Sequence, residues 1–93
     1  MYRVIVLYEQ EPAAATYAEH VEVCKQVPSS VFRHGKITGA PMGDAEHAYY
    51  AEWEFADENA FKTATRSDEF MATSKDAYKR GLPQATVEFL ELS

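Results

Sequence analysis

The segment YRVIVLY, residues 2–8, is apolar on both of its alternating faces apart from Arg3. β-Branched and aromatic side chains dominate it, and the loop sequence EQEP follows. Successive side chains of a strand point to opposite faces, so a run of this kind is typical of a strand covered on both sides. The segment therefore predicts a central strand of a sheet with material packed against each face.

Turn and capping residues divide the rest of the chain into further elements. Pro12 and Pro28 bound a helix over residues 13–27, and Asp57 and Ser67 are natural N-caps for two later helical segments. The elements predicted after residues 2–8 are a helix over 13–27, strands over 31–38 and 48–56, helices over 58–65 and 68–80, and a strand over 85–92. Gly35, in the middle of the strand 31–38, suggests a bulge or a close backbone approach. This order predicts a single α+β domain over residues 1–93 with the ferredoxin-like βαββαβ fold, a four-stranded antiparallel sheet with helices on one face.

The predicted sheet has one face without a helix. Because the strand 2–8 is apolar on both sides, that second face requires a partner. A chain of 93 residues also buries a modest share of its surface on its own. We therefore expect a homodimer in which two sheets stack face to face.

The composition restricts which classes of partner the chain can bind. Nine basic residues stand against fifteen acidic ones, and the resulting net charge of −6 repels nucleic acids and anionic membranes. The opening apolar run is too short for a signal peptide or a membrane span. Cys24 is the only cysteine, so neither an intrachain disulfide nor a C-x-x-C site can form. These features favour a cytoplasmic protein that binds neither nucleic acid nor membrane.

His20 is the main candidate for chemistry. Helical spacing places it on an apolar stripe whose members are Ala13, Tyr17, His20, Cys24 and Val27. Histidine accepts and donates protons at neutral pH, and a carboxylate beside it makes the usual acid/base pair. We expect Glu52, in the middle of the strand 48–56, to be that carboxylate. The alternatives are a core histidine bonded to a backbone carbonyl and a solvated Glu52 that shares its face with Glu54.

Aromatic residues surround these two positions. Four of them are candidate substrate-binding residues: Tyr8, Tyr17, Tyr50 and Trp53. His34 lies 14 positions after His20, and His47 lies 13 positions after His34. This spacing matches no metal-binding motif. We therefore expect no metal site.

The chain resembles the EthD-like proteins of the dimeric α/β-barrel superfamily. His20 and Pro28 keep the family spacing of a first-helix histidine and a proline eight positions later. The segments AEWEF, residues 51–55, and RSDEFMATSKDAYKR, residues 66–80, resemble two further family segments. Val21, Glu22 and Val23 after the histidine depart from the family's Pro-Leu pattern, and Ser29 replaces the usual glycine. The resemblance implies a homodimer with its small-molecule site between helix and sheet.

Two functions remain open on these grounds. The first is a cofactor-free acid/base enzyme of the isomerase, cyclase, dehydratase or monooxygenase type that acts on a small, largely apolar carbonyl or phenolic metabolite. His20 and Glu52 are then catalytic, and the tyrosines donate hydrogen bonds to a developing oxyanion. The alternative is a non-catalytic small-molecule-binding dimer that supports a catabolic oxygenase. Haem bound through His20 is a minor possibility, and otherwise we expect no cofactor.

Overall fold

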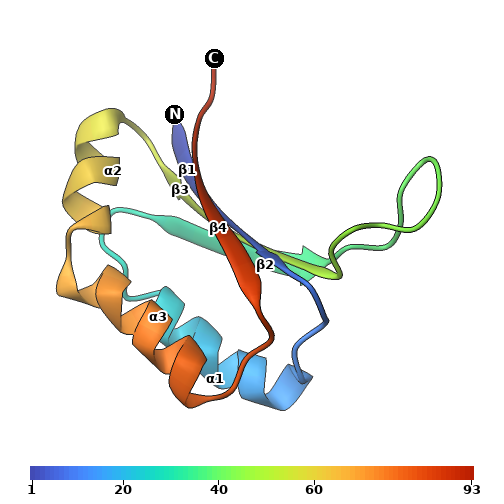
Figure 1. Cartoon of the computed structure of the whole chain (residues 1–93). Coiled ribbons are helices and arrows are strands. Elements are labelled where there is room, and N and C mark those ends of the chain that lie inside the picture. The colour runs from blue at the N-terminus through green and yellow to red at the C-terminus, as the bar shows by residue number, and fades with distance from the viewer.

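The computed structural model describes all 93 residues as one sheet with a helical layer (Figure 1). In chain order the elements are β1 (Tyr2–Tyr8), α1 (Ala14–Cys24), β2 (Val31–Lys36), β3 (Tyr49–Phe55), α2 (Glu58–Thr65), α3 (Asp68–Lys79) and β4 (Ala85–Glu91). The three helices lie on one side of the sheet, and α1 and α3 pack against each other. The predicted ferredoxin-like fold is confirmed.

The sheet is antiparallel throughout, with the strand order β2-β3-β1-β4. β1 therefore lies inside the sheet, as its two apolar faces predicted. Val4 is opposite Trp53 on β3 and Phe89 on β4, and Tyr8 is opposite Tyr49 and Ala85. Residues opposite one another point to the same face, so this register fixes which side chains meet the helices.

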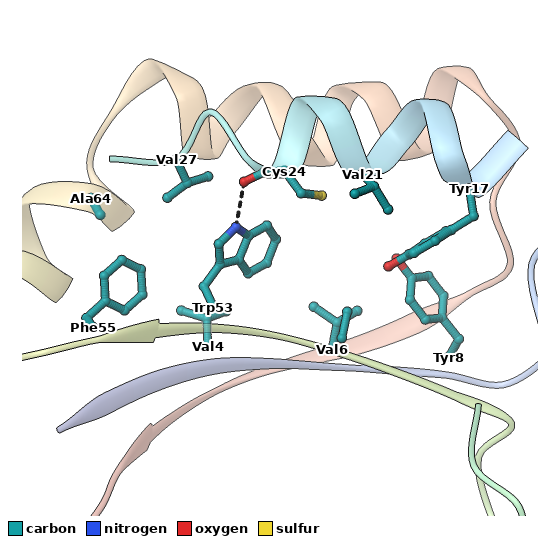
Figure 2. Packing of buried hydrophobic residues seen from close by; sticks show 11 residues of the cluster. Val4, Val6, Tyr8, Tyr17, Val21, Cys24, Val27, Trp53, Phe55 and Ala64 are labelled. Atoms are coloured by element: carbon teal, nitrogen blue, oxygen red, sulfur yellow. Dashed lines mark hydrogen bonds between the residues drawn. The ribbon is translucent and has the colours of Figure 1, made fainter. Parts of the chain in front are cut away.

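The core lies between the sheet and the helices (Figure 2). Val4, Phe55 and Cys24 are almost completely buried there. Trp53 reaches up from β3, and its indole Nε1 donates a 2.9 Å hydrogen bond to the backbone carbonyl of Cys24. This bond satisfies a carbonyl at the end of α1 and fixes the distance between the helix and the sheet.

Two local predictions were wrong. α1 ends at Cys24 and not at Val27, because the amides of Gln26 and Val27 bond to carbonyls three residues earlier and tighten the chain into a turn. Gly35 marks no bulge: His34, Gly35 and Lys36 pair in unbroken register with β3. A side chain at Gly35 would meet no atom within 4 Å, so no other part of the chain approaches it closely.

The face of the sheet without helices is mixed in character. Its apolar side chains come from Ile5, Leu7, Val31 and Leu90. Between them lies a group of charged side chains, which we call the open-face cluster: Arg3, Arg33, Glu52 and Glu54. The unpartnered face is therefore present as expected, but ion pairs interrupt its apolar surface. No helix is both long and apolar enough to cross a membrane.

Candidate active site

A cavity of about 370 Å³ opens between α1, α3, β1 and β4. Nine of its thirteen lining residues are hydrophobic, which suits a small apolar ligand. The lining residues are Val6, Tyr8, His20, Trp53, Phe70, Thr73, Ser74, Ala77, Tyr78, Leu82, Pro83, Ala85 and Val87. We call this space the first cavity.

His20 is the only histidine that lines the first cavity. Its side chain projects from the middle of α1 and is 3% exposed. The ring Nδ1 lies 2.7 Å from Oδ2 of Asp76 on α3. Nε2 makes no hydrogen bond within the chain. Every fully buried side-chain nitrogen of the chain has a hydrogen-bond partner, so Nε2 is not fully buried. Nε2 is therefore open to the cavity and free to meet a ligand.

Asp76 holds the other side of this ring. Its Oδ2 also accepts a 2.8 Å bond from Nε of Arg80, whose guanidinium pairs with Glu19 on α1. Burial alone would raise the pKa of Asp76, but the hydrogen bonds from Arg80 and His20 outweigh it and hold that pKa below its usual value. Asp76 is therefore an ionised carboxylate at neutral pH, which orients the imidazole and favours Nε2 as the reactive nitrogen.

A pair of bonded tyrosines lies at one end of the first cavity, and only Tyr8 lines it. The Tyr8 hydroxyl donates a 3.3 Å hydrogen bond to the hydroxyl of Tyr17 on α1 (Figure 2). Burial raises the pKa of Tyr8, and the bond to Tyr17 lowers it by less. Burial and the bond to Tyr8 also raise the pKa of Tyr17 well above its usual value. Both phenols are therefore neutral hydrogen-bond donors at physiological pH.

Glu52 does not meet His20, so the predicted pair is not formed. Trp53 points toward the helices and lines the first cavity, and strand alternation therefore turns Glu52 to the open face. There its carboxylate accepts bonds of 2.6 Å from Arg33 and 2.8 Å from Tyr50. Tyr50 shares that face and lines neither cavity of the chain. Of the predicted site residues, His20, Tyr8 and Trp53 meet in the first cavity, and Tyr17 lies behind Tyr8.

Asp76 is the site residue that the sequence did not reveal. It lies 56 positions after His20, and its only local signal is the i,i+4 pair with Arg80. No group of three or more His, Cys, Asp or Glu side chains is placed to hold a metal ion. His34 bonds to the hydroxyl of Tyr49 instead.

These features define a class of protein, a ferredoxin-like α+β domain with a histidine in a pocket between helix and sheet. No family model matches the chain, and neither does any curated protein. Among solved structures, an ethyl tert-butyl ether degradation (EthD) family protein from Bacillus halodurans is similar over 100% of this chain and 99% of its own, with 28% identity and a TM-score of 0.77. At 28% identity over its whole length, the chain is similar to this EthD family protein in sequence as well as in fold.

Two more distant structures share the fold. A protein of unknown function from Jannaschia sp., described as dimeric and ferredoxin-like, has 16% identity, coverage of 98% of both chains and a TM-score of 0.70. SnoaB from Streptomyces nogalater, described as a cofactor-independent oxygenase, has 17% identity, coverage of 98% of this chain and 91% of its own, and a TM-score of 0.60.

Proposed function

We propose that this chain is a cofactor-free acid/base enzyme that acts on a small, largely apolar carbonyl or phenolic metabolite. The observation that carries this proposal is the His20–Asp76 pair: one ring nitrogen is held at 2.7 Å by a carboxylate, and the other is open to an apolar cavity. A histidine oriented by a carboxylate is the arrangement that general acid/base catalysis uses.

The chemistry follows from this geometry. Neutral His20 takes a proton from a carbon next to a carbonyl group, or from a phenolic hydroxyl, through Nε2. With a ketone, the pair of the broken C–H bond forms the enolate C=C bond and the carbonyl π pair moves onto the oxygen, whereas with a phenol the pair of the O–H bond stays on the oxygen. Asp76 stabilises the imidazolium that forms. The Tyr8 hydroxyl, whose 3.3 Å bond to Tyr17 is long and therefore weak, turns to donate to the developing oxyanion. Return of the proton from His20 to a different atom completes an isomerisation.

The similar structures support this choice without naming the reaction. SnoaB is described as cofactor-independent, so the fold is known to accommodate catalysis without a cofactor. The first cavity of this chain offers one proton-transfer group and one buried phenol beside an apolar wall. Such a site favours substrates that are already activated, because one acid/base residue contributes roughly 10²–10⁴-fold to a rate.

A homodimer is part of the proposal. The open face presents Ile5, Leu7, Val31 and Leu90 around the charged open-face cluster, and nothing in one chain covers it. Glu52 is only 6% exposed there and is matched by two arginines. A second copy of the chain would cover the apolar side chains, while Glu52 and Glu54 would keep their ion pairs with the arginines of the open-face cluster. The dimeric description of the Jannaschia protein supports this arrangement.

Proton exchange tests the enzyme directly. The α-hydrogens of 2-tetralone in D₂O, followed by ¹H NMR, report proton abstraction next to a carbonyl. We expect the protein to accelerate exchange and His20→Ala to lose about 10²-fold or more of that acceleration. His47→Ala is the matched control, because His47 lies in the loop between β2 and β3 and lines neither cavity.

The outcomes separate the two functions. Exchange that is unchanged in His20→Ala would remove His20 from the mechanism. Quenching of Trp53, the only tryptophan and a lining residue of the first cavity, would report binding of the ketone. Saturable quenching with no accelerated exchange would instead favour the non-catalytic binding protein. Size-exclusion chromatography with light scattering tests the dimer, and a stable monomer at micromolar concentration would contradict it.

A further inference from the structure

A second cavity lies on the other side of α1, toward β2. It measures about 340 Å³, close to the size of the first cavity. Its lining residues are Glu11, Pro12, Ala14, Tyr17, Ala18, Val21, Glu22, Lys25, His34 and Tyr49. The proposed reaction uses none of them directly, since His20 and Tyr8 line only the first cavity.

The two cavities lie over one row of the sheet. Ala85 on β4 is opposite Tyr8 on β1, and Tyr8 is opposite Tyr49 on β3. Ala85 and Tyr8 line the first cavity, whereas Tyr49 lines the second. Because opposite residues have their Cβ atoms about 4.5–5.5 Å apart, the two spaces adjoin at the contact between Tyr8 and Tyr49.

Tyr17 fills the position above this contact. Its ring packs edge-on against Tyr8 at 5.7 Å and against Tyr49 at 5.2 Å between centroids. It also lies between two histidines, 5.4 Å from the ring of His20 and 5.2 Å from that of His34. Tyr17 is 3% exposed, lines the second cavity and packs against Tyr8 and His20 of the first, so its ring lies between the two cavities.

The second cavity has polar lining groups of its own, His34 and Tyr49. Tyr49 lies with its hydroxyl 2.6 Å from Nδ1 of His34. Burial and the charge of Lys25 lower the pKa of His34, so the ring is neutral at pH 7. When Tyr49 donates to Nδ1, the proton of the neutral ring is on Nε2, which can donate to a ligand oxygen.

We propose that Tyr17 determines which substrates fit, by closing the first cavity against the second and so restricting this chain to compounds of one or two fused rings. This inference rests on the proposed function and specifies its substrate class. Without the Tyr17 ring the two spaces form one elongated site, with His20 near one end and the His34–Tyr49 pair near the other.

Binding measurements test this without an activity assay. Isothermal titration calorimetry would compare 2-naphthol, which is compact, with trans-4,4′-dihydroxystilbene, which is elongated and carries an oxygen at each end. The wild-type chain should bind 2-naphthol and bind the stilbene at least about tenfold more weakly. Tyr17→Leu should strengthen stilbene binding by about tenfold or more, as burial of a second ring implies, and change 2-naphthol binding by less than about threefold.

Two variants complete the design. Tyr17→Phe keeps the ring and should still exclude the stilbene, and adding His34→Ala to Tyr17→Leu should reverse most of the gained affinity. Tyr17→Met replaces Tyr17→Leu if thermal melts show that the leucine variant is unfolded. Equal binding of both compounds to the wild-type chain, or no gain for the stilbene in a folded variant, would overturn the role of Tyr17. Failure of every variant and the wild type to bind 2-naphthol would instead contradict the proposed function.

Discussion

Replacing Asp76 with asparagine isolates the charge that supports His20. Oδ2 of Asp76 accepts both the His20 bond at 2.7 Å and the Arg80 bond at 2.8 Å. One amide oxygen can occupy the same position and accept the same two bonds, so Asp76→Asn removes the negative charge while it keeps the shape. The variant therefore tests electrostatics and not packing.

The size of the effect follows from the loss of a charged acceptor. A hydrogen bond to a charged group contributes about 1.5–3 kcal/mol, against about 0.5–1.5 kcal/mol for a neutral bond. The His20–Asp76 contact should therefore weaken by about 1–1.5 kcal/mol in the resting enzyme, and by more when His20 carries a positive charge during proton transfer. We expect exchange of 2-tetralone to slow by about 10- to 100-fold, less than the loss in His20→Ala.

Acid titration gives a second measurement for the same variant. The pKa of Asp76 is lowered in the folded chain, so its ionised form stabilises the fold above the unfolded pKa of about 3.9. That stability is lost as the pH falls through the lower, folded value. The difference in unfolding free energy between the wild type and Asp76→Asn should therefore be largest near pH 7 and shrink below about pH 4.

Glu19→Gln is the matched control. It removes the second carboxylate that pairs with Arg80 but leaves the His20–Asp76 bond in place. Because Glu19 is largely exposed, its ion pair should contribute little to stability or to exchange. Equal losses of exchange in Asp76→Asn and Glu19→Gln, or a full rate in Asp76→Asn, would refute the assigned role of Asp76.

Two further predictions concern groups outside the His20 pair. Burial, followed by the charge of Asp76, raises the pKa of the Cys24 thiol to about 12. Iodoacetamide at pH 8 should therefore leave Cys24 unmodified in the native chain and label it only in denaturant. Rapid labelling of the native chain would contradict the burial of Cys24. Glu52→Gln removes the charge that faces Arg33 and Arg3, so it should lower the melting temperature and weaken the dimer in light scattering, while His20-dependent exchange per folded chain is unchanged. A specific loss of exchange in folded Glu52→Gln would restore Glu52 as a catalytic residue.

The element order and the sheet were predictable because their signals are local. The apolar character of both faces of the strand 2–8 placed it inside the sheet, and Asp57 and Ser67 cap their helices by accepting bonds from Ala60 and Phe70 as expected. The helix end at Cys24 was not predictable, because Pro28 restricts only the residue before it and leaves the preceding turns free to tighten. Gly35 occupies a regular strand position, which a single glycine does not reveal.

The site was predictable in part. Helical spacing alone put His20 on the buried stripe, and it is buried. The expectation that Glu52 and Trp53 both belong to the His20 site conflicts with strand alternation, because neighbouring residues of β3 point to opposite faces. The indole is large and apolar and the carboxylate is charged, so Trp53 takes the core side and Glu52 the open side. Asp76 depends on how α3 packs on α1, which no local pattern encodes.

The position of Asp76 implies a division of roles between the two layers. The reacting ring and its carboxylate both come from helices, and α1 and α3 are in direct contact. The sheet contributes Tyr8, Trp53 and an apolar floor to the first cavity. Changes at the α1–α3 contact should therefore alter proton transfer, because they move the carboxylate relative to the ring. Changes at the apolar sheet residues Val6 and Val87 should instead alter which ligand binds, because they reshape the wall without touching either Tyr8 or the His20–Asp76 bond.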